Sequence, residues 1–338
     1  MKTQSRYQKV LNFLKRASLR LIILALVLAI AGTVYQTAAT EADRRNFPPP
    51  GVLVNVDGYK MHIHCMGEGN PTIILDHVGG GSSVDWALIQ PKLAEHTRVC
   101  AYDRAGFGWS DFSPAPRTLE QQVRELHQLL RGANEQGPYL LVGHSYGARV
   151  SRVYAATYPD EVTGMVLMDA GILYDDPRYP PELHSQAESE DQMLRVARWL
   201  APFGLTRLMQ PLMVSPTFDL PEEARRESAS FAASSRFFQA VLAQSDSMQI
   251  VLEEEHAITS LGDIPLLVLT ANEPDDAIRS VWSQANIEMA SLSTNGSYTI
   301  VDGATHMSLA YRESDAQVCT AGILDVLTAA RTATSQHP

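Results

Sequence analysis

Cysteine is scarce in this 338-residue chain, and its three copies, Cys65, Cys100 and Cys319, lie far apart in the sequence. None of them pairs in the C-x-x-C spacing of redox motifs and zinc sites, and an odd number cannot form a complete disulfide framework. We therefore expect three core thiols. This pattern leaves the redox compartment of the protein open.

Acidic residues are missing from the first forty positions, although the whole chain holds 38 Asp and Glu against 27 Lys and Arg, a net charge of −11. Six of the bases precede residue 21, so the rest of the chain carries 21 bases, 38 acids and a net charge of −17. Its bases form no cluster on a candidate helix. Such a body argues against nucleic acid or an anionic membrane surface as its partner. With 45% hydrophobic and 19% charged residues, the body should be one large globular unit.

Residues 21–40 carry no charge, and a helix of that length spans a hydrocarbon core of roughly 30 Å. The preceding bases should stay cytoplasmic under the positive-inside rule. We therefore predict a single-pass membrane anchor over residues 1–40, a Pro-rich linker over 41–51, and an extracytoplasmic body. The alternative is a signal peptide cleaved near Ala29-Ile30-Ala31, which would give a secreted or periplasmic protein.

The body alternates short apolar runs with helix-length amphipathic stretches, a pattern typical of a mostly parallel sheet covered on both faces. The Asp57-Gly58 turn should join the first two strands as an antiparallel edge hairpin. Helices are predicted over residues 119–131, 148–157 and 315–331. The eight predicted strands are residues 52–56, 60–66, 72–76, 98–102, 139–143, 164–168, 265–270 and 298–302.

Strand signals disappear between residues 171 and 261, and Pro residues divide this segment into short helices. Met193, Val196, Ala197 and Leu200 follow helical spacing and predict one apolar helix face. We therefore predict a helical cap over residues 172–261, inserted after the sixth strand into an α/β core of residues 52–171 and 262–338. Such a cap would cover the carboxyl ends of the strands, where α/β sheets place their sites.

A predicted strand runs directly into Gly143-His144-Ser145-Tyr146-Gly147 and then into a helix. In this G-x-S-x-G setting the serine occupies a strained turn, and a larger residue at either glycine would clash with the backbone. Ser145 is therefore the candidate nucleophile.

A serine nucleophile needs a base, and His306 is the leading candidate because it follows the last strand on a loop late in the chain. His62 and His64 would share one strand face, but no third metal ligand stands near them. We interpret both as surface or edge residues, and we expect no metal site.

The chain from about residue 52 to 331 resembles the α/β-hydrolase fold family, and in particular its capped serine hydrolases: esterases, lipases, C–C bond hydrolases and prolyl aminopeptidases. The resemblance implies an eight-stranded, mostly parallel sheet flanked by helices. It also implies that residues 103–110 form a tight loop near the rim of the active site. The motifs that carry it are His77 with Gly79-Gly80-Gly81, residues 103–110, the Ser145 turn and residues 303–306.

Two backbone N–H groups should form the oxyanion hole, one from Tyr146 and one from the loop after the third strand. Relatives usually have His-Gly at the start of that loop, whereas this chain has His77-Val78-Gly79. Gly79 is our first choice for the second donor, and Val78 is the alternative.

The acid of the triad has two candidate positions. Most relatives place it just after the strand that follows the cap, where this chain has Pro274 followed by Asp275 and Asp276. Haloalkane-dehalogenase-like relatives place it at the end of the sixth strand, where this chain has Asp169. We place Asp169 first because its strand end is fixed by the sheet, and Asp275 or Asp276 remains the alternative.

These features predict a carboxylic ester hydrolase that acts on a small-molecule acyl substrate through an acyl-enzyme, with no metal, nucleotide or flavin cofactor. C–C hydrolase, aminopeptidase and acyltransferase chemistry could use the same triad. A membrane-tethered binding protein that kept the fold without catalysis is the alternative from another class.

Overall fold

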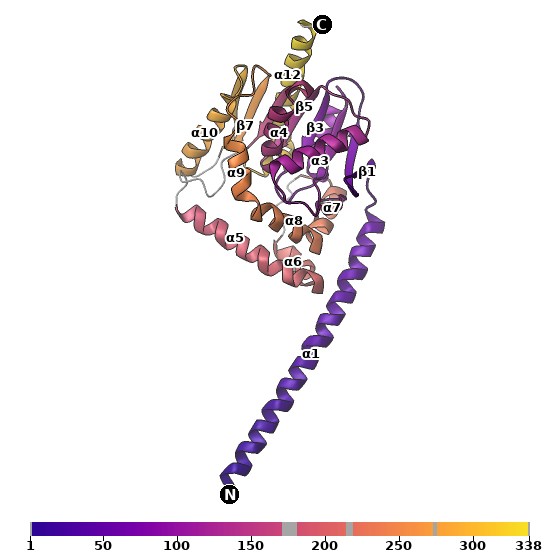
Figure 1. Cartoon of the computed structure of the whole chain (residues 1–338), viewed down its shortest axis with the longest axis vertical. Coiled ribbons are helices and arrows are strands. Elements are labelled where there is room, and N and C mark those ends of the chain that lie inside the picture. The colour runs from indigo at the N-terminus through magenta and orange to yellow at the C-terminus, as the bar shows by residue number, and fades with distance from the viewer. Residues whose placement is uncertain (1, 171–180, 214–218, 273–275, 337–338) are drawn as a thin grey trace.

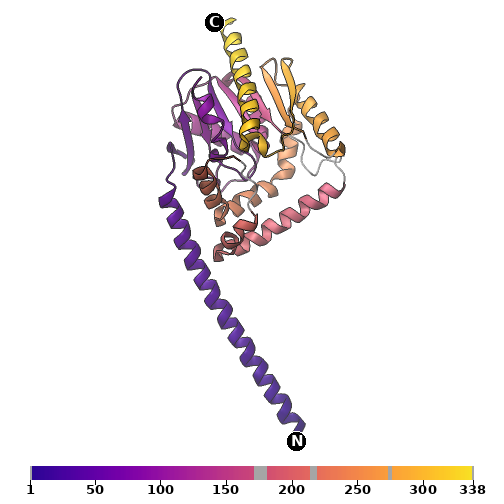
Figure 2. The ribbon, with the colours of Figure 1, turned by 180° about the vertical axis from the view of Figure 1, so that it is seen from behind.

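The computed structural model describes residues 2–336 except 171–180, 214–218 and 273–275. A central sheet with helices on both faces forms the body, and one long N-terminal helix projects from it (Figure 1). Seen from behind, that helix and the last helix of the chain point away from opposite ends of the body (Figure 2).

The sheet has eight strands in the order β1-β2-β4-β3-β5-β6-β7-β8. β1 pairs antiparallel with β2, and β2 pairs antiparallel with β4, whereas all other neighbours are parallel. The prediction of a mostly parallel eight-stranded sheet with an edge hairpin is confirmed. The strands are β1 (Val52–Val56), β2 (Tyr59–Met66), β3 (Thr72–Asp76), β4 (Val99–Tyr102), β5 (Tyr139–His144), β6 (Val162–Met168), β7 (Leu266–Ala271) and β8 (Gly296–Val301).

Helices enclose two hydrophobic cores, one on each face of the sheet. Successive strand residues point to opposite faces, so Ile74 packs in the core that contains α3 and α4, whereas Ile73 and Leu75 pack in the core that contains α2 and α12. Burial on both faces explains why the parallel strands read as continuous apolar runs. These helices are η1 (Ser83–Trp86), α2 (Gln90–Leu93), α3 (Leu119–Gly132), α4 (Tyr146–Thr157), η2 (Pro159–Glu161), α10 (Asp276–Ala290), α11 (Ser308–Tyr311) and α12 (Glu313–Gln336).

The described residues between β6 and β7 form six helical segments, in the stretch where the sequence predicts a cap, and these cover one end of the body (Figure 1). We call α5–α9 the cap. Its elements are α5 (Pro181–Leu200), η3 (Ala201–Phe203), α6 (Leu205–Met213), α7 (Glu222–Ala232), α8 (Ser235–Asp246) and α9 (Met248–His256).

The apolar face predicted on α5 is only partly buried. Ala197 packs against Phe238 in a small cap core, as expected. Met193 and Val196 are each 58% exposed, so the predicted apolar face lies on a helix as expected but is not buried along its whole width. Helical spacing identifies an apolar stripe but not what covers it, and α5 carries apolar residues on two sides.

The N-terminal helix α1 (Lys2–Asn46) is one uninterrupted helix. An 18-residue window within it reaches a mean hydropathy of 2.3 with no burial in the body, so α1 is long and apolar enough to cross a membrane. The helix continues through residues 41–46, which the sequence analysis assigned to a linker. Only residues 47–51 separate α1 from β1, because the first proline stands at position 48 and nothing before it interrupts the helix.

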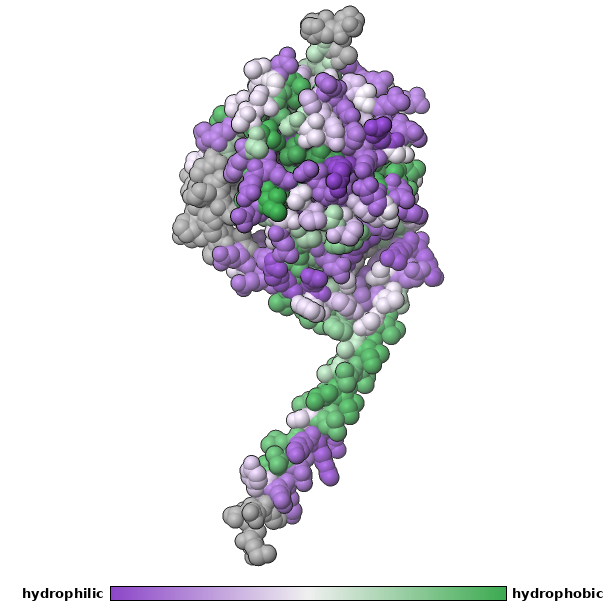
Figure 3. Space-filling view, in the orientation of Figure 1, coloured by the Kyte–Doolittle hydropathy of each residue, from purple (hydrophilic) through white to green (hydrophobic). Residues whose placement is uncertain are grey.

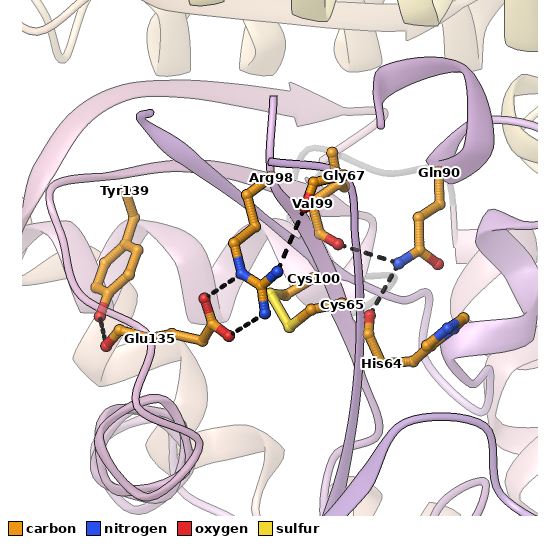
Figure 4. The surroundings of a disulfide bond; sticks show 9 residues. All are labelled: His64, Cys65, Gly67, Gln90, Arg98, Val99, Cys100, Glu135 and Tyr139. Carbon is orange, nitrogen blue, oxygen red and sulfur yellow. Dashed lines mark hydrogen bonds and ion pairs between the residues drawn. A yellow bond between two sulfur atoms is a disulfide. The ribbon is translucent and has the colours of Figure 1, made fainter. Parts of the chain in front are cut away.

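Cys65 and Cys100 face each other on β2 and β4 and form a disulfide with a Cα–Cα distance of 4.0 Å (Figure 4). The prediction of three core thiols is therefore wrong for these two, and only Cys319 is a free, buried thiol. The pairing arises because β4 lies between β2 and β3, an order that cysteine spacing does not reveal. The ion pair between Arg98 and Glu135 lies beside the bridge (Figure 4).

Candidate active site

Ser145 occupies the sharp turn between β5 and α4. Its backbone has φ 55° and ψ −113°, a conformation that L residues rarely adopt. A Cβ atom at Gly143 would lie 2.4 Å from the backbone N of Ala148, and one at Gly147 would lie 2.4 Å from the carbonyl O of Asp76. Both positions therefore require glycine, as the G-x-S-x-G motif predicts.

His306 and Asp169 meet across the carboxyl ends of the strands. Asp169 directly follows β6, and His306 lies on the loop after β8, where the predicted base was expected. Nδ1 of His306 lies 2.6 Å from Oδ2 of Asp169. Of the alternative acids, Asp275 lies outside the described residues, and the side chain of Asp276, the first residue of α10, is not described either.

The carboxylate of Asp169 is buried, 1% exposed, and every contact it makes is with a donor. Its Oδ1 accepts hydrogen bonds from the indole N–H of Trp282 at 2.7 Å, from the hydroxyl of Thr270 at 2.9 Å and from the N–H of Ala271 at 3.0 Å. Burial by itself would raise the pKa of Asp169. The hydrogen bonds and the charge of His306 outweigh it and lower this pKa below its ordinary value.

His144 connects this pair to the serine turn. Its Nε2 lies 2.9 Å from the carbonyl O of His306, and the two imidazole rings are 5.0 Å apart. The N–H of Ser145 donates to the carbonyl O of Met168 at 2.9 Å, one residue before Asp169. His306 thus contacts Asp169 directly, and it lies next to the serine turn through the ring of His144. Complete burial lowers the pKa of His144 to about 3, so its ring is neutral at ordinary pH.

The loop after β3 lies against the start of α4. A Cβ atom at Gly79 would lie 3.5 Å from Cβ of Tyr146, so the two candidate oxyanion donors are neighbours. Among the described residues, neither the N–H of Tyr146 nor that of Gly79 donates to a backbone carbonyl. The carbonyl of Val78 accepts from the N–H of Gly81 and closes a tight turn. Gly79 and Tyr146 therefore present two unused donors side by side.

Arg104 stabilises the loop after β3 by donating hydrogen bonds to its backbone. The sequence analysis did not identify this role of Arg104. Its guanidinium donates to the carbonyl O atoms of His77 at 2.7 Å and Val78 at 2.8 Å, and it forms a buried ion pair with Asp76. Tyr102 also donates to Asp76, at 2.5 Å. In the sequence, Asp76 ends β3 and Arg104 follows β4. The two residues become neighbours only because β3 and β4 are adjacent in the sheet.

A cavity of about 410 Å³ opens between this loop and the cap. Gly79 and Met307 line it, and they neighbour the candidate site in space and in sequence, whereas the side chains of Ser145 and His306 do not line it. Gly106, Phe107 and Gly108 line another wall, which agrees with the rim position expected for residues 103–110. Most of the remaining wall comes from the cap. The apolar side chains there are Phe231, Phe237 and Phe238, and the charged groups are Asp85 of η1 with Arg225 and Arg236 of the cap.

The buried histidine of β2 has a structural partner. His62 is 0% exposed and β2 is not an edge strand, so its prediction as a surface or edge residue is wrong. Its Nδ1 lies 2.9 Å from Oδ2 of Asp103, and its Nε2 contacts the carbonyl of Pro50. Within the described ranges, Cys65, Cys100 and Glu135 form the one group with the spacing of metal ligands, and the disulfide occupies both sulfur atoms.

A family model described as the alpha/beta hydrolase fold matches residues 71–263, more than half of the chain. The chain belongs to the α/β-hydrolase fold family. The matched range contains Ser145, Asp169 and the whole cap. His306 lies beyond it, so its place in this α/β-hydrolase site rests on the geometry described above.

Relatives of this α/β-hydrolase include an uncharacterized Bacillus subtilis protein, YqjL, which is 38% identical over 118 residues, 35% of this chain and 47% of YqjL. The 2-hydroxy-6-oxo-2,4-heptadienoate hydrolase of Pseudomonas putida is 33% identical over 125 residues, 36% of this chain and 44% of that enzyme. The chain thus spans about half the length of the curated relatives that it matches. A thermophilic esterase from Thermogutta terrifontis has the same fold, with a TM-score of 0.60 and 20% identity over 82% of this chain and 98% of the esterase.

Proposed function

We propose that this α/β-hydrolase is a serine hydrolase that cleaves a carboxylic ester through an acyl-enzyme. The observation that carries the proposal is the arrangement of three residues that follow strands. Ser145 occupies a strained turn, the ring of the adjacent His144 contacts the carbonyl O of His306, and Nδ1 of His306 contacts Asp169. This arrangement has the nucleophile, base and acid of a catalytic triad in the chain order typical of the fold.

In the proposed reaction, Oγ of Ser145 attacks the carbonyl carbon of the ester while Nε2 of His306 takes the hydroxyl proton. Nδ1 of His306 already faces Asp169, so Nε2 is the nitrogen left for this transfer. The N–H groups of Tyr146 and Gly79 stabilise the oxyanion of the tetrahedral intermediate.

The intermediate collapses when His306 returns its proton to the departing alkoxide, which leaves an alcohol and an acyl group on Ser145. His306 then deprotonates a water molecule, and the resulting attack releases the carboxylic acid and restores the hydroxyl of Ser145. Asp169 orients the ring of His306 and balances its charge in both steps.

The three phenylalanines of the cap favour an apolar acyl group in the cavity. The experiment that tests the function is hydrolysis of p-nitrophenyl esters of graded acyl length by the wild-type protein and by Ser145→Ala. We expect wild-type turnover that depends on acyl length and is lost in the variant. Turnover of no ester in the series, or equal turnover by both proteins, would contradict the proposal.

C–C bond hydrolysis is the second candidate, because a relative of this chain is named as a hydrolase of 2-hydroxy-6-oxo-2,4-heptadienoate. The same Ser145 and His306 would serve such a substrate. Turnover of a 2-hydroxy-6-oxo-dienoate with no turnover of any p-nitrophenyl ester would favour this candidate over the esterase.

The proposal includes a membrane location: α1 anchors the chain, its basic end stays in the cytoplasm, and the body lies on the other side. The positive-inside rule supports this orientation, and so does the Cys65–Cys100 disulfide, because disulfides persist in oxidising compartments. A topology reporter fused after Pro338 should be extracytoplasmic, and a cytoplasmic reporter would overturn the orientation. The mass of the mature chain distinguishes an anchor from a cleaved signal peptide.

A further inference from the structure

One exposed surface of the cap carries several large apolar side chains. On α5 the side chains of Met193, Val196 and Trp199 point away from the cap core, and Trp199 is 77% exposed. The surface continues through η3 and the first part of α6, where Phe203, Leu205, Leu208 and Met209 are 40–64% exposed. We call this surface the cap underside and define it by Met193, Val196, Trp199, Phe203, Leu205 and Leu208.

The helix α1 packs against the same corner of the cap. A Cβ atom at Gly32 would lie 2.3 Å from the carbonyl O of Phe203, and one at Gly204 would lie 2.8 Å from the ring of Tyr35. Gln36 donates from Nε2 to the carbonyl O of Ala233 at 3.0 Å. The α1 residues that make these contacts, at positions 32, 35 and 36, share one helix face. This close packing fixes where the cap underside lies along α1.

The length of α1 then sets the depth of the cap underside in a membrane. A span of about 20 residues is needed to cross the hydrocarbon core, and residues 21–40 are the uncharged ones. The part before the first of its contacts with the cap, residues 21–31, is only about 17 Å long at 1.5 Å per residue. A span shifted toward the N-terminus would place Arg20, Arg16 and Lys15 in the hydrocarbon core, which is unfavourable for charged groups.

A span over residues 21–40 therefore places Gly32 and the residues after it, together with the cap corner they contact, at membrane depth. The side chains exposed at that corner are those of Phe203, Leu205 and Leu208. Figure 3 shows hydrophobic residues on this end of the body that continue into the apolar middle of α1, with a hydrophilic stretch beyond it.

Arg207, a charged residue at this corner, is neutralised by an acidic residue of α1. Arg207 of α6 lies between Thr206 and Leu208, but its guanidinium forms an ion pair with Asp43 at 2.7 Å and donates to Gln36 at 3.2 Å. Its side chain is only 13% exposed. The bond between Arg207 and α1 thus removes a charge from the surface that would meet lipid.

We propose that the cap underside is a membrane-docking surface, which inserts into the extracytoplasmic leaflet beside α1. Trp199 and Tyr35 are both exposed, and aromatic side chains of this kind are enriched near the boundary between lipid and water. The docking is apolar, which agrees with a body of net charge −17 that would gain nothing from anionic lipid. The proposal rests on the membrane anchorage proposed above.

Docking at this surface would bring the cavity close to the lipid. Leu194 of α5 and Thr206 and Gln210 of α6 line the cavity from the same two helices that carry the cap underside. One helix layer, about 10 Å thick, therefore separates the cavity from the membrane. If the proposed hydrolase function holds, its esters reach the site from the lipid phase.

Trp199 is a built-in probe for the test. The full chain is reconstituted in phosphatidylcholine vesicles with or without bromine on the upper acyl carbons, and tryptophan emission is compared between wild type and Trp199→Phe. We expect brominated lipid to quench most of the emission that the substitution removes. Emission from Trp199 that brominated lipid leaves unchanged would overturn the proposal.

Flotation of the same vesicles separates docking from anchorage. Protein that fails to float with lipid overturns both proposals, whereas protein that floats with an unquenched Trp199 overturns docking alone. Leu208→Glu should weaken the quenching of Trp199, and Ile287→Glu, at a 47% exposed position on α10, should not. Quenching that requires added phosphatidylglycerol would contradict an apolar surface.

Discussion

Oδ2 of Asp169 lies 2.6 Å from Nδ1 of His306, although 137 residues separate them in the sequence. Asp169 is held in place by three further donors on β7 and α10, so it cannot turn away without leaving a buried charge unpaired. The contact fixes the ring of His306 with Nε2 available for proton transfer.

Asp169→Asn should therefore lower kcat by roughly 10⁴-fold, because an amide no longer balances the imidazolium or selects its tautomer. The measurement is kcat on the best p-nitrophenyl ester. Asp275→Asn is the matched control and should change kcat little. The reverse result would assign the acid to the loop before α10.

The buried pair of Arg104 and Asp76 should be costly to break. Arg104→Met leaves the carboxylate of Asp76 buried without its cation, so we expect the free energy of unfolding to fall by about 3–5 kcal/mol. The double variant Arg104→Met/Asp76→Asn should recover part of this loss, as measured by denaturant titration. A double variant no more stable than Arg104→Met would contradict the assignment.

His144 should make stability depend on pH in the mildly acidic range. Its pKa is about 3 when folded and near 6.5 when unfolded, so between these values the unfolded chain binds the extra proton. The contribution of neutral His144 to the free energy of unfolding is therefore fully present above pH 6.5, and it is lost as the pH falls from 6.5 toward 3. The loss should be about 2 kcal/mol by pH 5, at about 1.4 kcal/mol per pH unit.

The measurement is the free energy of unfolding at pH 7 and pH 5 for wild type and His144→Gln. The variant should lose about 2 kcal/mol less than wild type between the two pH values. Groups far from His144 titrate equally in both proteins, so the difference reports His144 together with its contact to His306. An identical loss in both would show that His144 does not carry this dependence.

The Cys65–Cys100 bridge closes a segment with a sequence separation of 35. Reduction should lower the free energy of unfolding by about 4 kcal/mol in the chain-entropy view, measured by denaturant titration with and without dithiothreitol. Thiol titration in denaturant should find one free cysteine before reduction and three after it. Three free thiols in the unreduced protein would contradict the bridge.

Much of the fold follows from local sequence pattern. Fully buried parallel strands are short apolar runs, and the glycines around Ser145 are required by contacts within a few residues. The nucleophile turn and the position of His306 could therefore be predicted. The ends of the predicted strands are also within about two residues of those observed.

What could not be predicted depends on which elements become neighbours. The strand order places Cys65 opposite Cys100 and Asp76 beside Arg104, and the spacing of these residues in the sequence predicts neither pairing. The choice between Asp169 and Asp275 likewise depends on where the loop of His306 returns. Met193 and Val196, which are exposed, show that an apolar stripe does not identify what packs against it.

Labelling with a fluorophosphonate probe tests the central claim most directly, because the probe reacts with a serine only where a base and an oxyanion hole activate it. The wild-type chain in vesicles should be labelled, and Ser145→Ala should not. A wild-type chain that resists labelling, or equal labelling of Ser145→Ala, would contradict the assignment of Ser145 as the nucleophile of this α/β-hydrolase.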